Sequence, residues 1–170
     1  MVKRLPKPHF PAYFKGYVSK VKGSAITTLQ KQEKDLADLF KLINKKNIEF
    51  SYAPGKWSLK EVLVHMIDTE QIFSYRALAI ARGETNAIPG YDQDLYIKNA
   101  NLEHITKKQI ADNFKAIRKS SLFLFDTFGT EDWVRKGKAN GKIFNASAFP
   151  YLIAGHTKHH IDVIKKKYLK

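Results

Sequence analysis

Four long stretches of the chain carry apolar side chains at helical spacing, and this pattern restricts the folds open to it. Within each stretch apolar residues recur every three or four positions, as on the buried stripe of an amphipathic helix. No convincing pair of alternating strands accompanies them. The stretches run from about Phe14 to Ile43, from Ser58 to Gly83, from Thr106 to Phe128 and from Ala146 to Tyr168. The sequence therefore predicts an all-α fold.

Helices of this length most simply form an antiparallel four-helix bundle around one shared core. The chain has 170 residues, about the size of one domain, so a single domain over residues 1–170 is expected. A long connection from Gly83 to His104 separates the second and third helices. Its length indicates either a crossover along the bundle or a lid over a site. A local hairpin or loop is expected around Asn140 and Gly141.

The starts of the helices are marked to different degrees. Ser58 is a natural N-cap, and Glu61 three residues later completes a capping box. Thr106 and Gln109 form a second candidate capping box at the third helix. The first helix has a weaker beginning, because Gly23 lies within it and glycine lowers helix stability.

The chain contains no cysteine, which excludes disulfides, thiolate metal sites and cysteine nucleophiles. Histidine and carboxylate are the remaining ligand types. No apolar run approaches the roughly 20 residues that span a bilayer, and the basic N-terminus has no hydrophobic region after it. We therefore expect a cytoplasmic protein without a membrane partner.

The formal net charge of +14 raises the alternative of a module that binds nucleic acid or an acidic partner. The lysines, however, are dispersed over three separate segments, on or beside the polar faces of predicted helices. There is no recognition-helix signature and no arginine motif interleaved with aromatic residues. A solvated lysine-rich surface is the interpretation that we favour over nucleic-acid binding.

Three histidines lie within five positions of the segment AGHTKHHIDVI, residues 154–164. At about 100° per residue, His156 and His160 project along the apolar stripe of the last helix, and His159 falls toward its edge. Two imidazoles at positions i and i+4 can converge on one metal ion. The residues that share the stripe are Phe149, Ile153, Val163 and Ile164.

A third ligand would have to come from another helix. His65 is the candidate, because it borders the apolar stripe of the second helix, although no spacing rule links separate helices. Three imidazoles would leave one position of a divalent ion open, as in catalytic rather than structural sites. The alternative is a scaffold whose core histidines satisfy one another or bond to backbone carbonyls.

Other polar residues are candidates for supporting roles around such a site. Asp68, three residues after His65, could accept a hydrogen bond from an imidazole, or could be exposed to solvent. Gln32 is the polar member of the first helix's apolar stripe, and His159 could replace His156 or line a pocket. Arg76 borders the second helix's stripe.

The segments YAPGKWSLKEVLVHMIDTEQIFSYRALAIARGE, IPGYDQD and YLIAGHTKHHIDVIKKKYL resemble the DinB-like superfamily, in its DinB/YfiT-type branch. The resemblance runs from about Phe50 to Leu169, and the first helix matches only in character. It implies a four-helix bundle in which His65, His156 and His160 bind one divalent metal ion per chain. Zinc or nickel is the ion expected, and a homodimer is the expected assembly.

The resemblance also implies a range of activities. Characterised members of the family include S-transferases and an isomerase in which a metal activates a low-molecular-weight thiol, and others are described as metal-dependent hydrolases. We therefore expect a transferase or hydrolase for a small molecule, with a low-molecular-weight thiol as a candidate co-substrate. Residues that could orient the substrate are Arg76, Tyr91, Asp92 and Asp94. The competing expectation is a non-enzymatic binding or stress-response module.

Overall fold

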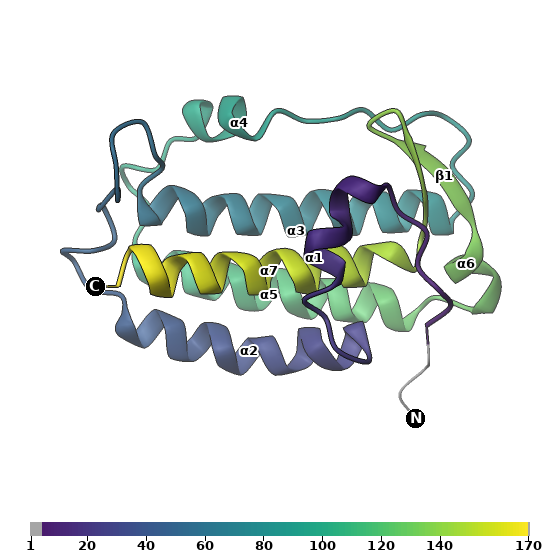
Figure 1. Ribbon diagram of the computed structural model, residues 1–170, viewed down its shortest axis with the longest axis horizontal. Helices are drawn as coiled ribbons and strands as arrows, with labels where there is room; N and C mark the ends of the chain where they lie inside the picture. Colours follow the sequence, from purple (N-terminus) through teal and green to yellow (C-terminus); the bar gives the residue numbers. More distant parts are fainter. Residues whose placement is uncertain (1–4, 170) are drawn as a thin grey trace.

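The computed structural model describes residues 5–169, so both ends of the domain expected over residues 1–170 lie outside the described residues. Four long helices form a bundle (Figure 1). α3 packs against α5 and α7, and α2 packs against the same two helices, so α2 and α3 lie on a diagonal of the bundle. The predicted all-α four-helix fold is confirmed. The four helices are α2 (Ala25–Leu42), α3 (Leu59–Ala81), α5 (Lys107–Asp126) and α7 (Ala148–Lys167).

The directions of the helices differ from the simple antiparallel prediction. In Figure 1, α3 and α5 run the same way along the bundle, and α2 and α7 run the opposite way. Two neighbouring parallel helices need a connection that returns along the whole bundle. The segment after α3 does this: it passes back along α3 and contains a short helix, α4 (Gln93–Asn99), that packs on α3. Of the two alternatives that its length left open, a crossover or a lid, the long connection is a crossover along the bundle.

The first predicted helix, expected to be continuous from Phe14 to Ile43, is broken in two. A 3₁₀ turn, η1 (Ala12–Phe14), leads into the short α1 (Lys15–Val18). Gly23 then has a φ of 77°, a left-handed conformation that a helix cannot contain. Ser24 starts the new helix by capping α2 with its side-chain oxygen. The break lets α1 turn away from α2 and cross α7 (Figure 1).

The starts of α3 and α5 follow the sequence signals. The hydroxyl of Ser58 accepts a hydrogen bond from the backbone of Glu61, whose carboxylate accepts one from the backbone of Ser58. Thr106 and Gln109 make the same reciprocal pair at α5. Both predicted capping boxes are confirmed, and they fix where the two parallel helices begin.

A β-hairpin closes the other end of the bundle. β1 (Lys136–Ala139) pairs with β2 (Lys142–Asn145) in an antiparallel arrangement. Asn140 and Gly141 join the strands, with φ values of 48° and 69°. Two successive positive φ angles are what a two-residue hairpin turn requires, and Asn-Gly adopts them readily. The predicted hairpin is confirmed.

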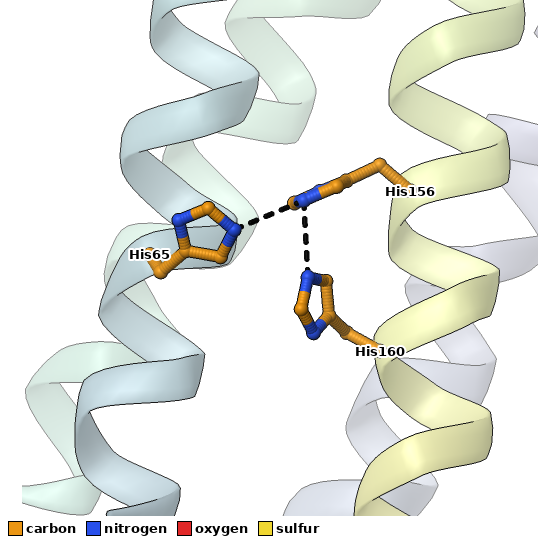
Figure 2. A group of neighbouring side chains, drawn as sticks. All are labelled: His65, His156 and His160. Atoms are coloured by element: carbon orange, nitrogen blue, oxygen red, sulfur yellow. Dashed lines mark hydrogen bonds between the residues drawn. The ribbon is translucent and has the colours of Figure 1, made fainter. Parts of the chain in front are cut away.

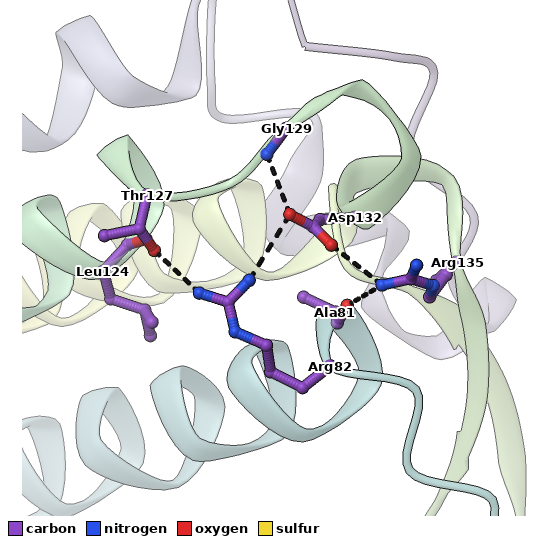
Figure 3. A network of polar contacts seen from close by, with 7 residues as sticks. All are labelled: Ala81, Arg82, Leu124, Thr127, Gly129, Asp132 and Arg135. Carbon is purple, nitrogen blue, oxygen red and sulfur yellow. Dashed lines mark hydrogen bonds and ion pairs between the residues drawn. The ribbon is translucent and has the colours of Figure 1, made fainter.

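A polar network ties this end of the bundle together (Figure 3). Between α5 and the hairpin lies a short helix, α6 (Thr130–Val134). Asp132 of α6 accepts hydrogen bonds from the backbone of Gly129 at 2.9 Å and from Arg135 at 2.8 Å. Arg82, just after α3, reaches Asp132 at 3.4 Å and the hydroxyl of Thr127 at 3.2 Å. The end of α3 is thus anchored to α6.

The core is divided into two hydrophobic clusters, where one shared core was expected. A buried polar layer separates them near the middle of the four helices. Arg118 of α5 donates to both carboxylate oxygens of Glu70 on α3, at 2.8 Å each. It also reaches the carbonyl of Leu29 at 2.8 Å and the hydroxyl of Thr157 at 3.3 Å. All four helices therefore meet at the guanidinium of Arg118.

None of the helices within residues 5–169 combines the length and hydrophobicity that a bilayer-spanning helix requires.

Candidate metal centre

Three imidazole rings converge between two helices of the bundle (Figure 2). His65 comes from α3, and His156 and His160 come from successive turns of α7. The Nε2 atom of His156 lies 3.1 Å from Nε2 of His65 and 3.0 Å from Nε2 of His160. His65 and His156 are buried, and His160 is partly buried. The three residues singled out in the sequence are thus brought together.

Burial keeps the three imidazoles in the neutral form. It lowers the pKa of His65 to about 4 and, together with the neighbouring His65 and His159, lowers the pKa of His160 to about 3. The pKa of His156 is also held well below its ordinary value, first by burial and then by the other histidines. A neutral imidazole nitrogen has a free lone pair, which is the form that binds a metal ion.

Hydrogen bonding alone does not satisfy this arrangement. An imidazole nitrogen carries either one hydrogen or one lone pair, so Nε2 of His156 can make a good hydrogen bond with only one of its two neighbours. A cation between the rings accepts all three lone pairs together. Zinc ligands at 2.0–2.1 Å in a tetrahedral site stand about 3.3 Å apart, within a few tenths of an ångström of the separations here. The three side chains fit a divalent ion.

The far nitrogen of His65 faces Thr69, one helical turn further along α3. The hydroxyl of Thr69 lies 3.5 Å from Nδ1 of His65, at the long limit of a hydrogen bond, and 2.9 Å from the hydroxyl of Tyr91. Such contacts fix the orientation of a ligating ring. Thr69 was overlooked as a functional residue, although its spacing of four from His65 was a usable signal. Asp68 makes no hydrogen bond with an imidazole among the residues that the structure describes.

The other candidate residues have different surroundings. Gln32 is buried away from the rings: its amide donates to the carbonyl of Ala154 at 2.8 Å and so joins α2 to α7. His159 is not among the three converging ligands, and its ring packs against those of His160 and Tyr17, with centroids 5.0 and 5.4 Å apart. Asp92 caps α4 through its carboxylate.

Two cavities border the histidines. We call the first the His160 cavity: it has a volume of about 400 Å³, and its walls include Trp57, Asp94, His159 and His160. The second, the Arg76 cavity, measures about 230 Å³. Its walls include Thr69, Arg76, Tyr91 and His156, together with aromatic rings of η1 and α1. A small molecule in either cavity would therefore lie beside one of the imidazoles.

Comparison with known proteins identifies the family to which the chain belongs. The profile of the DinB superfamily matches residues 28–164, a range that includes all three histidines. The chain belongs to the DinB superfamily. Among solved structures, YfiT from Bacillus subtilis superimposes with a TM-score of 0.76 at 17% sequence identity, and the match covers 95% of this chain and 89% of that one. No curated protein matches the chain significantly.

This DinB-superfamily chain shares its fold with YfiT, which is described as "a probable metal-dependent hydrolase with an unusual four-helix bundle topology". The resemblance to the family and the four-helix architecture are thereby confirmed. The segment containing η1 and α1 precedes the range that the family profile matches. The aromatic residues that η1 and α1 add to the Arg76 cavity therefore lie outside the matched range.

Proposed function

We propose that this DinB-superfamily chain is a metal-dependent enzyme that acts on a small molecule through one divalent ion bound by His65, His156 and His160. The observation that supports it is the convergence of three neutral imidazoles: Nε2 of His156 lies 3.1 Å from Nε2 of His65 and 3.0 Å from Nε2 of His160. Zinc or nickel suits the donor set, because imidazole nitrogen is a good ligand for both.

The chain's own residues would hold the ion and leave one of its coordination positions open. Three protein ligands occupy three positions of a four-coordinate ion, so one position is free for water or substrate. When bound, such an ion supplies Lewis acidity and lowers the pKa of a coordinated water or thiol. His156 and His160 each line a cavity, so substrate can approach from either side of the site.

The reaction class that we propose is group transfer from or to a low-molecular-weight thiol, or hydrolysis. The chain has no cysteine, so a thiolate nucleophile would have to come from a co-substrate. A conjugation screen with small thiols and an ester or amide hydrolysis screen on zinc-loaded protein would separate the two. A homodimer and a cytoplasmic location, expected above, stay predictions.

The first test is the metal content of untagged protein purified without chelators. We expect about one equivalent of zinc or nickel per chain by elemental analysis, as a mononuclear three-histidine site requires. His160→Ala should remove it, because two ligands hold a divalent ion poorly. His104→Ala is the matched control, since His104 is exposed.

Wild-type protein that stays free of metal after incubation with either ion would refute the proposal. Equal metal content in His160→Ala and wild type would refute the ligand assignment.

A further inference from the structure

Two arginines are buried in the bundle, and only one of them has a carboxylate partner. Arg118 and Arg76 expose 1% and 4% of their surface. Arg118 forms a forked ion pair with Glu70, in which Nε and Nη2 each donate to one carboxylate oxygen. Arg76 has no ion pair with any residue in the described part of the chain. A buried charge without a counter-charge is unfavourable, so its retention calls for an explanation.

The contacts of Arg76 within the described residues leave one donor of its guanidinium without a partner. Nη2 donates to the carbonyl of Pro89 at 2.9 Å, and the central carbon lies 5.8 Å from the ring of Tyr91 and 6.0 Å from that of Phe73. Nε is buried and has no hydrogen-bond partner among residues 5–169. Nε is one of the two atoms with which Arg118 grips Glu70. On the corresponding edge of Arg76, Nη2 already donates to Pro89 and Nε is the donor that lacks a partner.

This unpartnered donor belongs to a side chain that lines a cavity shared with the candidate metal centre. Arg76, Thr69 and His156 all border the Arg76 cavity. Between them lie aromatic rings, among them Phe73 and Tyr91. The volume of about 230 Å³ is below the range of roughly 300–1,000 Å³ typical for drug-sized ligands, so a fragment-sized molecule is the expected occupant.

We propose that the Arg76 cavity binds a small carboxylate, with the guanidinium of Arg76 as the group that receives the carboxylate. This inference rests on the proposed function, whose substrate class it names: a carboxylate with an aromatic or apolar body that extends toward His156. Thr69 and Arg76 are seven residues apart on α3, about 10 Å along the helix axis. The substrate's reactive group would then lie near the imidazoles while its carboxylate is held at the other end of the cavity.

The chemistry of the cavity selects for this ligand class. A guanidinium binds a carboxylate through two parallel hydrogen bonds. These charge-assisted bonds are stronger at a buried site than in contact with solvent. The aromatic walls favour a flat apolar body over a strongly hydrated one. A neutral molecule of the same shape would leave the charge of Arg76 unpaired.

The experiment uses benzoate as the probe and benzamide as its neutral counterpart of the same shape. The buried Nε–H of Arg76 gives an NMR signal that is assigned by its loss in Arg76→Lys. We expect benzoate to shift this signal and to bind about tenfold or more tightly than benzamide, in metal-free and in zinc-loaded protein alike. Arg76→Gln should abolish the preference for benzoate. Arg82→Gln, which changes an exposed arginine near the end of α3, should keep it.

Two outcomes would overturn the inference. If wild-type protein binds benzoate no better than benzamide, the cavity does not recognise a carboxylate, and this comparison holds even if an Arg76 variant fails to fold. If the preference exists only in the zinc-loaded protein, the ion and not Arg76 holds the carboxylate. Conversely, a benzoate preference in wild-type protein that binds neither zinc nor nickel would support the carboxylate site while the proposed metal-dependent function fails.

Discussion

At the scale of single residues, the buried histidines link the stability of the fold to pH. An unfolded histidine has a pKa near 6.5, whereas that of folded His65 is about 4 and that of folded His160 about 3. Between these values the unfolded chain binds more protons than the folded one. The contribution of the neutral imidazoles is therefore complete above pH 6.5 and is lost as the pH falls toward 4.

We predict that the free energy of unfolding of metal-free protein decreases on acidification from pH 6.5 to 4.5. The slope should be at most about 1.4 kcal/mol per pH unit for each histidine that stays neutral in the fold. Urea denaturation over this pH range measures it. His65→Gln removes one of these groups and should flatten the curve, and an unchanged slope in this variant would contradict the assignment.

A second residue-scale prediction concerns the ion pair of Arg118 and Glu70, whose side chains are 1% and 2% exposed. Arg118→Met leaves the carboxylate of Glu70 buried and unpaired, so we expect a loss of about 3–5 kcal/mol in the free energy of unfolding. The matched control is Lys108→Met, because the pair of Lys108 and Asp112 is exposed to solvent and should contribute little to stability.

Adding Glu70→Met to Arg118→Met should recover much of that loss, since no buried charge then remains. A single variant as stable as wild type would show that Glu70 is solvated or neutral in the fold.

The sequence predicted the three histidines correctly as neighbours but missed this ion pair. His156 and His160 replace hydrocarbons on an apolar stripe, which makes them visible. Arg118 lies at helical spacing from Phe114 and Phe125 and so belongs to the same buried stripe. A charged side chain, however, is ordinarily expected at the surface. Only the three-dimensional structure shows that Glu70 faces it across the bundle.

At the scale of elements, α1 and α7 approach each other closely at Gly155. A methyl group at Gly155 of α7 would stand 2.2 Å from the backbone oxygen of Tyr17 in α1. Tyr17 also packs its ring on His156, with centroids 5.5 Å apart. The position of α1 beside the three histidines therefore depends on the absence of a side chain at residue 155.

We predict that Gly155→Ala displaces α1, although alanine normally stabilises a helix by about 1 kcal/mol relative to glycine. Trypsin should then cleave faster at Lys20 and Lys22 in the link between α1 and α2. Gly16→Ala is the control, because a methyl group there meets nothing within 4 Å and the cleavage rate should not rise. Equal cleavage rates in Gly155→Ala and wild type would mean that α1 tolerates the methyl group.

Element boundaries were predictable where a local signal sets them. The capping boxes at Ser58 and Thr106 are contained in four consecutive residues each, so single-sequence reasoning found both. The break between α1 and α2 was not found, because apolar residues keep their spacing across it. Gly23 weakens a helix, but whether the helix ends there depends on what α1 gains by packing on α7.

At the scale of the whole molecule, the sequence pattern did not predict the directions in which the helices run relative to one another. A stripe of apolar residues shows which face of a helix is buried but not the direction of the neighbouring helix. The parallel arrangement of α3 and α5 follows from the crossover, whose length alone was informative. The polar layer that divides the core was not predicted either, because the pattern does not show which residues of neighbouring helices face one another.

The last prediction concerns the stability of the entire bundle when metal is added. An ion that binds only the folded chain stabilises it by about 2.7 kcal/mol at one hundred times its Kd, which raises Tm by about 5–10 °C for a domain of this size. Thermal denaturation with zinc or nickel and with a chelator measures this change. His160→Ala should not respond. If the Tm of wild type is also unaffected, the histidines serve only to pack against one another.

The crossover between α3 and α5 has a consequence for how this architecture can diversify. Gln93, in that connection, borders both the His160 and the Arg76 cavities, and Tyr91 two positions earlier touches Thr69. The imidazoles themselves come from α3 and α7 and do not belong to this segment. Exchanging the crossover between relatives would thus change the walls of both cavities while the three imidazoles stay in place, so chimeras made this way would separate the selection of a ligand from the proposed binding of an ion.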